Sequence, residues 1–255
     1  KIRVVAEELG LDFFETIFEV VDYKRMNEIA SYGGFPTRYP HWRFGMEYER
    51  LSKSFSYGLH KIYELVINND PCYAYLLEGN SVVDQKMVMA HVYGHCDFFK
   101  NNHWFSPTNR KMIDQMANHG ARVRRYVDQW GITPVEDFLD VCLTIDNLID
   151  RHSPYITRTR RPADDDGPSR AEPRRLTAHK QYLERYINPD DVIEEERQRL
   201  QAEAAEKDKR FPREPELDVM HFLMQHAPLK RWQADVLNIV RSEAYYFSPQ
   251  GMTKI

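Results

Sequence analysis

The sequence has few cysteines, and they show none of the spacings that are typical of disulfide-bonded or metal-binding cysteines. Its three cysteines, Cys72, Cys96 and Cys142, are widely spaced and form no CxxC pair. An odd, scattered set of thiols is typical of a reducing compartment rather than of a disulfide-bonded secreted domain. Residues 1–10 also lack the apolar core of a signal peptide. The sequence therefore predicts a cytoplasmic protein.

Long apolar runs and an excess of basic charge are missing as well. No stretch approaches the ~20 apolar residues that a membrane-spanning helix needs. The formal net charge is −4, which provides no basic field to attract nucleic acid or an anionic membrane. The Gly-rich phosphate loop and the nucleophile elbow are absent too. We therefore expect no membrane span and no nucleic-acid partner.

Helical periodicity extends along most of the 255 residues. Apolar residues recur at helical spacing over 4–30, and another strong apolar stripe follows Thr133. Residues 61–67 and 72–77 are instead rich in β-branched and aromatic side chains, with the turn sequence Asn-Asn-Asp-Pro between them. The predicted fold class is mainly α with a small β-hairpin or sheet (α+β).

The composition changes sharply over residues 157–175, where Arg, Asp and Pro gather with almost nothing to bury. Such a composition predicts an exposed, flexible linker or loop. We therefore expect an α-rich core domain at 1–156, the linker at 157–175, and a helical segment at 176–255 that packs on the core. Within the last segment, residues 191–208 predict a charged helix with little apolar face.

The most informative motif is a pair of histidines, His91 and His95, in an apolar helix that should begin at a Ser81 capping box. A spacing of four residues places both imidazoles on one face, one turn apart, where they can bind a single metal ion such as zinc. Zinc peptidases share this spacing, and in them a glutamate general base follows the first histidine. Val92 occupies that position here.

A hairpin followed by a His-x-x-x-His helix predicts a zincin-like arrangement without ordinary peptidase chemistry, so the sequence leaves open whether the protein is an enzyme. Two interpretations of the histidines also stay open, a metal site completed by a ligand from elsewhere or two buried polar residues satisfied by their neighbours. No spacing argument selects a catalytic residue or a third ligand. The residues that we expect to form a pocket near the pair are Glu78, Asp84, Tyr93, Asn101, Asn102 and His103.

The helix predicted after Thr133 carries two pairs of carboxylates at helical spacing. Glu136 and Asp140 are four residues apart, and so are Asp146 and Asp150. These side chains either form a solvated acidic face or present carboxylates to the metal ion of the histidine pair. The sequence does not distinguish these alternatives.

Four long segments carry a family resemblance: HVYGHCDFFKNN at 91–102, YGGFPTRYPHWRFG at 32–45, YELVINNDP at 63–71 and FSPQGMTKI at 247–255. Together they resemble the stage V sporulation protein R (SpoVR) family, over the whole chain except the predicted linker. The resemblance implies a role in sporulation, at the peptidoglycan of the spore cortex, or in stress-related cell-wall processes. It also implies a serine-kinase-like partner.

Two main functional hypotheses follow from the resemblance and the histidine pair, beside a third, hydrolysis of a wall-related amide at an unusual metal site with Tyr93 or a residue outside this chain as the base. The first is a metal-binding protein of spore or cell-wall assembly, and the alternative is a non-enzymatic adaptor or regulator that works with the serine-kinase-like partner. Members of the family continue past the point that corresponds to Ile255, into a stretch with a glutamate and a histidine. We therefore expect a longer natural chain, in which a later carboxylate or imidazole completes the metal site.

Overall fold

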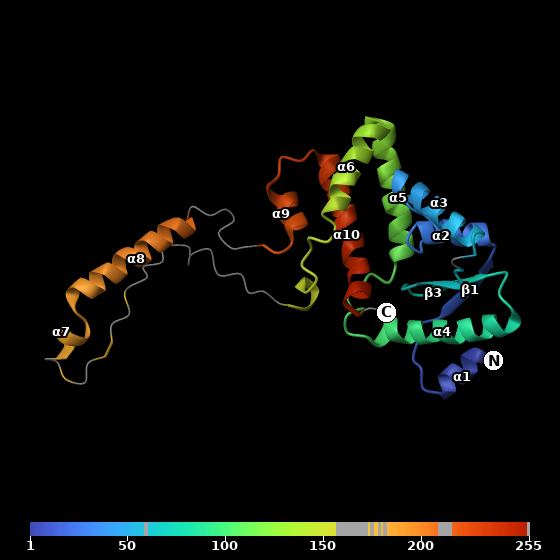
Figure 1. Ribbon diagram of the computed structural model, residues 1–255, viewed down its shortest axis with the longest axis horizontal. Coiled ribbons are helices and arrows are strands. Elements are labelled where there is room, and N and C mark those ends of the chain that lie inside the picture. The colour runs from blue at the N-terminus through green and yellow to red at the C-terminus, as the bar shows by residue number, and fades with distance from the viewer. Residues whose placement is uncertain are drawn as a thin grey trace. The chain divides into compact units, whose positions relative to one another are not determined.

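The computed structural model describes residues 1–58, 61–156, 173, 176–177, 180, 183–208 and 216–253. The chain forms two compact units, Lys1–Arg151 with Asp218–Ile255, and His152–Leu217. The first unit is mainly helical with a small sheet, which confirms the predicted α+β class (Figure 1). Its elements are α1 (Ile2–Glu8), β1 (Thr16–Val21), α2 (Tyr23–Ser31), α3 (Trp42–Ser56), β2 (Glu64–Ile67), β3 (Cys72–Leu77), α4 (Val82–Asn101), α5 (Met112–Trp130), α6 (Ile132–Thr144), α9 (Val219–His226) and α10 (Arg231–Thr253).

The second unit contains a short 3-10 helix, Ser153–Tyr155, and the helices α7 (Glu184–Ile187) and α8 (Asp190–Asp208). Helix α8 agrees with the charged helix predicted at 191–208. All of the predicted linker at 157–175 except Pro173 lies outside the described residues, so the predicted domain boundaries stay a prediction. Within the described part of the chain, no helix is both long and apolar enough to cross a membrane.

The sheet has the strand order β1-β3-β2. Strands β2 and β3 form the antiparallel hairpin that the sequence predicts. The expectation of continuous helical structure over 4–30 is wrong, because Thr16–Val21 forms β1, which pairs in parallel with β3 from Thr16 opposite Cys72 to Val21 opposite Leu77. The segment TIFEVV is rich in β-branched residues, which favour a strand. Pairing with β3 stabilises that strand, although the spacing of its apolar residues also fits a helix.

Strand β3 is buried on both faces, and its side chains alternate between two hydrophobic clusters. Cys72, Ala74 and Leu76 pack against α4, whereas Tyr75 and Leu77 belong to a cluster on the opposite face. This alternation is the period of two that a pleated strand imposes. The opposite cluster is completed from α2, α5 and α10 by Met26, Ile29, Met112, Met116 and Tyr246.

A third cluster joins α5, α6, α9 and α10. Its central members are Val123, Val135, Leu139, Val236 and Val240. Helix α5 also approaches the chain before α3, since a Cβ atom added to Gly120 would lie 3.3 Å from the carbonyl oxygen of Arg38.

A buried carboxylate fixes α9 to α10. Asp218 is the N-cap of α9 and accepts a hydrogen bond from the amide of His221 at 2.8 Å. Its Oδ2 accepts from Nη2 of Arg241 at 2.7 Å and lies 2.7 Å from the hydroxyl of Tyr245. Burial alone would raise the pKa of Asp218, but the hydrogen bonds from Arg241, Tyr245 and His221 outweigh it, so this pKa lies below the usual range.

We predict that Asp218→Asn flattens the acid dependence of stability. A carboxyl whose pKa is depressed on folding stabilises the fold above its unfolded pKa of about 3.9, and this contribution is lost as the pH falls. Urea unfolding from neutral pH to about pH 3 should therefore give a steeper loss of unfolding free energy for the wild type than for the variant. Parallel curves for the two proteins would contradict the prediction.

Candidate functional site

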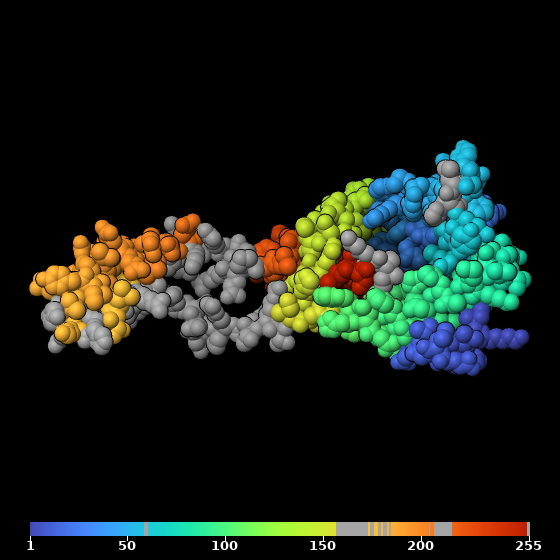
Figure 2. Space-filling model, turned by 60° about the horizontal axis from the view of Figure 1, so that its bottom comes forward, coloured from blue at the N-terminus to red at the C-terminus, as the bar shows by residue number. Residues whose placement is uncertain are grey.

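Helix α4 determines where the histidine pair lies. The hydroxyl of Ser81 accepts from the amide of Asp84, and the carboxylate of Asp84 accepts from the amide of Ser81, which is the predicted capping box. Val92 and Cys96 are fully buried against the sheet. His91 and His95 each precede one of these buried residues, so they lie about 100° around the helix from them. Figure 2 shows α4 at the surface, with α1 alongside it.

The two imidazole rings face each other. The Nε2 atoms of His91 and His95 are 2.9 Å apart, and the ring planes are inclined at 86°. Oε1 of Glu64 lies 3.7 Å from Nε2 of His91. Glu64 and Val66 alternate with Leu65 along β2, and Val66 packs in the cluster beneath α4. The register of the hairpin therefore directs a carboxylate from β2 toward the histidines.

The environments of the two histidines differ. The side chain of His91 is 59% exposed. His95 is partly buried, and its ring stacks on Phe99 at a centroid distance of 6.0 Å. Burial, and next the adjacent His91, lower the pKa of His95, which favours its neutral, metal-binding form. Among the described residues, no group of three or more His, Cys, Asp or Glu has the geometry to hold a metal ion.

Two of the predicted pocket residues lie before the histidines, and a third lies between them. Glu78 is exposed in the turn after β3, and its amide donates to the carbonyl of Val21 at 2.9 Å. The carboxylate of Asp84 serves the capping box. Tyr93 is buried on another face of α4, with its ring 4.5 Å from that of Phe13.

The other three lie at the end of α4. The side-chain amide of Asn101 donates to the carbonyl of Asp12 at 2.8 Å, and Oδ1 of Asn102 accepts from the amide of Trp104 at 2.9 Å. The rings of His103 and Trp104 are in contact, with centroids 5.6 Å apart. The structure therefore brings Glu64 close to His91, and it places these asparagines in contacts that hold the end of the helix.

The carboxylates of α6 contact the start of α3. Oε1 of Glu136 accepts from the amide of Trp42 at 2.9 Å, and Asp140 accepts from the indole nitrogen of Trp42 at 3.1 Å. Asp140 also lies 3.2 Å from Nε2 of His41. Glu136 and Asp140 thus hold two helices together, while Asp146 lines a separate pocket and Asp150 is buried.

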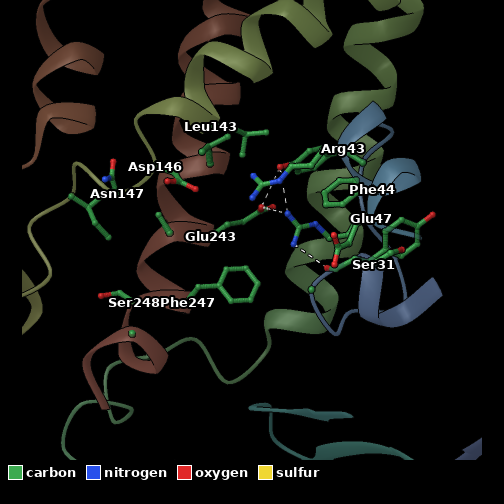
Figure 3. Close-up of a pocket in the computed structure, with 18 of the residues that line it drawn as sticks. Ser31, Arg43, Phe44, Glu47, Leu143, Asp146, Asn147, Glu243, Phe247 and Ser248 are labelled. Atoms are coloured by element: carbon green, nitrogen blue, oxygen red, sulfur yellow. Dashed lines mark hydrogen bonds and ion pairs between the residues drawn. The ribbon is translucent and has the colours of Figure 1, made fainter. Parts of the chain in front are cut away.

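A buried polar cluster, which the sequence analysis missed, lies beside this separate pocket (Figure 3). Glu243 of α10 is 4% exposed and accepts a hydrogen bond from Nη2 of Arg38 at 2.6 Å. Its other oxygen lies 3.0 Å from Nδ1 of His119 on α5. The guanidinium of Arg38 also lies 5.1 Å from the ring centre of Tyr39 and 5.0 Å from that of Phe44. Burial raises the pKa of Tyr39, so its hydroxyl stays protonated.

The pocket has a volume of ≈ 610 Å³, within the range of sites for small organic ligands. Its lining comes from the end of α2 and the chain that leads into α3, from α3, from the end of α6 and the segment after it, and from α10 (Figure 3). A second hollow of ≈ 690 Å³ shares Arg38, Tyr39 and Phe44 with it. One sequence signal was available, because Glu243 follows Val236, Ile239 and Val240 at core spacing on the last helix. A carboxylate at such a position indicates a buried partner.

We predict that Glu243→Gln lowers the free energy of unfolding by about 3–5 kcal/mol, because Arg38 then keeps a buried charge without its counter-ion. Glu47→Gln is the matched control, since Glu47 pairs with Arg50 at the surface, where an ion pair contributes about 0–1 kcal/mol. Urea denaturation measures both variants. Equal effects of the two substitutions would contradict the prediction.

The comparisons with known proteins agree with these motifs. The family model described as "SpoVR like protein" matches residues 1–255. The chain is 34% identical over 260 residues to a protein of Escherichia coli (strain K12) named "Uncharacterized protein YcgB". The match covers 98% of this chain and 48% of the relative, so the chain spans about half the length of that relative. No solved structure matches the chain. The resemblance read from the sequence is confirmed, and the chain belongs to the SpoVR-like protein family.

Proposed function

We propose that the protein binds a divalent metal ion, such as zinc, through His91 and His95, with Glu64 as the third ligand. The observation that supports this most directly is the approach to 2.9 Å of the Nε2 atoms of exposed His91 and partly buried His95. Two nitrogens bound to one tetrahedral zinc ion at about 2.0–2.1 Å are roughly 3.3 Å apart. A small outward rotation of either ring opens the pair to that separation.

Glu64 suits the role of third ligand because it comes from a different element. Its Oε1 is 3.7 Å from Nε2 of His91 and belongs to a side chain that is 21% exposed, so it needs only a modest movement to reach a shared ion. An ion held between β2 and α4 would link the hairpin to the helix that follows it. This combination of an antiparallel edge strand with a His-x-x-x-His helix is the zincin-like arrangement that we propose.

The proposed site binds metal without ordinary peptidase chemistry. A general base must lie within hydrogen-bond reach of the metal-bound water. Val92, at the position of the peptidase glutamate, is apolar and fully buried between α4 and the sheet. Tyr93 packs against Phe13 and Phe18 on another face of the helix. A bound ion would leave coordination positions open to solvent beside the exposed His91. We propose that these positions accept a ligand or a partner in sporulation, cortex peptidoglycan or stress-related cell-wall processes, as the family resemblance implies.

The structural features of α8 favour a second candidate function, that of an adaptor for a serine-kinase-like partner. None of the α8 residues for which the structure describes a side chain is buried. Among its described residues, Arg197 pairs locally with Glu194 at 3.0 Å and Arg199 with Glu203 at 3.7 Å. Most helices in proteins depend on a packed face for stability. A long charged helix without one offers its side chains to a partner.

The metal proposal predicts that the purified protein contains about one equivalent of metal by elemental analysis. His91→Ala with His95→Ala should abolish this metal, and Glu64→Gln should weaken zinc affinity by about tenfold or more, because a ligand is lost. Added zinc at about 100 times its Kd should stabilise the wild type by about 2.7 kcal/mol. Calorimetry and thermal unfolding measure the two effects.

Glu78→Gln is the matched control for Glu64→Gln, since it removes the exposed carboxylate that the sequence placed near the histidines. It should leave zinc affinity unchanged. A protein with no stoichiometric metal, or one whose metal content is the same after both histidines are replaced, would overturn the metal proposal.

The adaptor proposal predicts that the purified serine-kinase-like protein is retained by immobilised full chain. Arg197→Glu with Arg199→Glu should weaken this retention by about tenfold, because charge reversal at an interface opposes association. Arg3→Glu, on the exposed surface of α1, is the control and should have no effect. Failure to retain the kinase-like protein, or equal retention by both variants, would exclude α8 as the adaptor surface.

A further inference from the structure

The pocket of Figure 3 contains charged side chains of two kinds, paired and unpaired. Arg38 and Glu243 neutralise each other, and Glu47 is held by Arg50. Within the described residues, the side chains of Arg43 on α3, Asp146 after α6 and Arg151 have no hydrogen-bond or ion-pair partner. Figure 3 shows Asp146 and Arg43 on opposite sides of the pocket, with Glu243 between them. The pocket therefore presents two cations, Arg43 and Arg151, and one anion, Asp146, that form no ion pair within the described residues.

Arg151 also lines the pocket, beside the end of α10. A Cβ atom added to Gly251 would lie 3.9 Å from Nη1 of Arg151, so this guanidinium lies beside the last turn of α10. Carbonyl groups at the end of a helix attract cations. The charge of Arg43 also helps to lower the pKa of nearby Glu47, but no hydrogen bond holds its guanidinium within the described residues, so we assign Arg43 and Asp146 to a ligand.

The remaining walls suit an apolar side chain. Phe44 and Phe247 contribute aromatic rings from α3 and α10, and Leu143 and Val240 contribute aliphatic groups. Asn147 and Ser248 add polar atoms near the rim. Apolar walls with a few convergent polar groups are typical of sites for small organic ligands. The pocket is lined by no residue of α4, so it is separate from the histidine pair.

We propose that this pocket binds a small zwitterion, an amino acid or dipeptide with an aromatic or other apolar side chain. The carboxylate of the ligand pairs with Arg43, whose planar guanidinium matches two carboxylate oxygens. Its ammonium group pairs with Asp146, and its side chain packs against Phe44 and Phe247. A dianion such as phosphate fits less well, because the charge of Asp146 opposes a second negative charge.

The buried cluster gives this pocket a fixed floor. Arg38 is held by Glu243 at 2.6 Å and by the carbonyl of Tyr32 at 3.4 Å, and Glu243 is held in turn by His119. Nε of Arg38 has no hydrogen-bond partner within the described residues. These contacts fix the residue next to the pocket without consuming Arg43 or Asp146, so the two charges stay available to a ligand.

Calorimetry of the intact protein with glycyl-L-phenylalanine tests the proposal. Two blocked forms of the dipeptide serve as matched probes: N-acetylglycyl-L-phenylalanine lacks the ammonium group, and glycyl-L-phenylalaninamide lacks the carboxylate. We expect the free dipeptide to bind with a Kd of about 1 mM or lower, and each block to weaken binding by about tenfold. Inorganic phosphate should bind more weakly than the free dipeptide.

Variants separate the two contacts. Arg43→Gln should weaken binding of the free dipeptide about tenfold, so that it binds no more tightly than glycyl-L-phenylalaninamide. Asp146→Asn should make the free dipeptide bind no more tightly than N-acetylglycyl-L-phenylalanine. The controls are Arg125→Gln and Asp137→Asn, the same substitutions at exposed positions outside the pocket. They should change neither the affinity of the free dipeptide nor its difference from the blocked forms. The proposal is overturned if the dipeptide does not bind at about 10 mM, if all three peptides bind equally, or if the pocket variants behave like the controls.

Discussion

The burial of β3 on both faces is the constraint on which the rest of the first unit depends. Because side chains alternate along the strand, one set of residues must meet α4 while the other meets α2, α5 and α10. A shift of one residue in the pairing of β2 or β1 with β3 would exchange these sets. The same register that closes the two clusters also places Glu64 on the face that α4 covers.

The two sites differ in how they are attached to this framework. The histidine pair belongs to one helix and lies directly beside its buried stripe, so α4 presents Val92 to the core and His91 to solvent in consecutive positions. The pocket of Figure 3, in contrast, is assembled from three separated segments, and the ion pair at its floor joins residues 205 apart in the sequence. One site depends mainly on local geometry, and the other depends on the packing of whole helices.

This difference explains what the sequence could predict. The hairpin and the Ser81 capping box were predictable because their signals are short and local. The β1 strand was not, since its stability comes from pairing with a strand distant in sequence. The histidine spacing was visible, but the nearest carboxylate comes from the register of β2 on β3. Likewise, no pattern links Arg38 to Glu243, although a glutamate within the apolar stripe of α10 was a signal that a buried cation lies nearby.

The close approach of α5 to the backbone of Arg38 has a consequence for the precision of the pocket. Contact occurs between main-chain atoms, because Gly120 has no side chain to separate them. Arg38 lines the pocket, so a side chain at position 120 would push against the backbone of a residue of the pocket wall. A position that does not line the pocket thereby contributes to its shape, because the missing side chain of Gly120 leaves room for the backbone of Arg38.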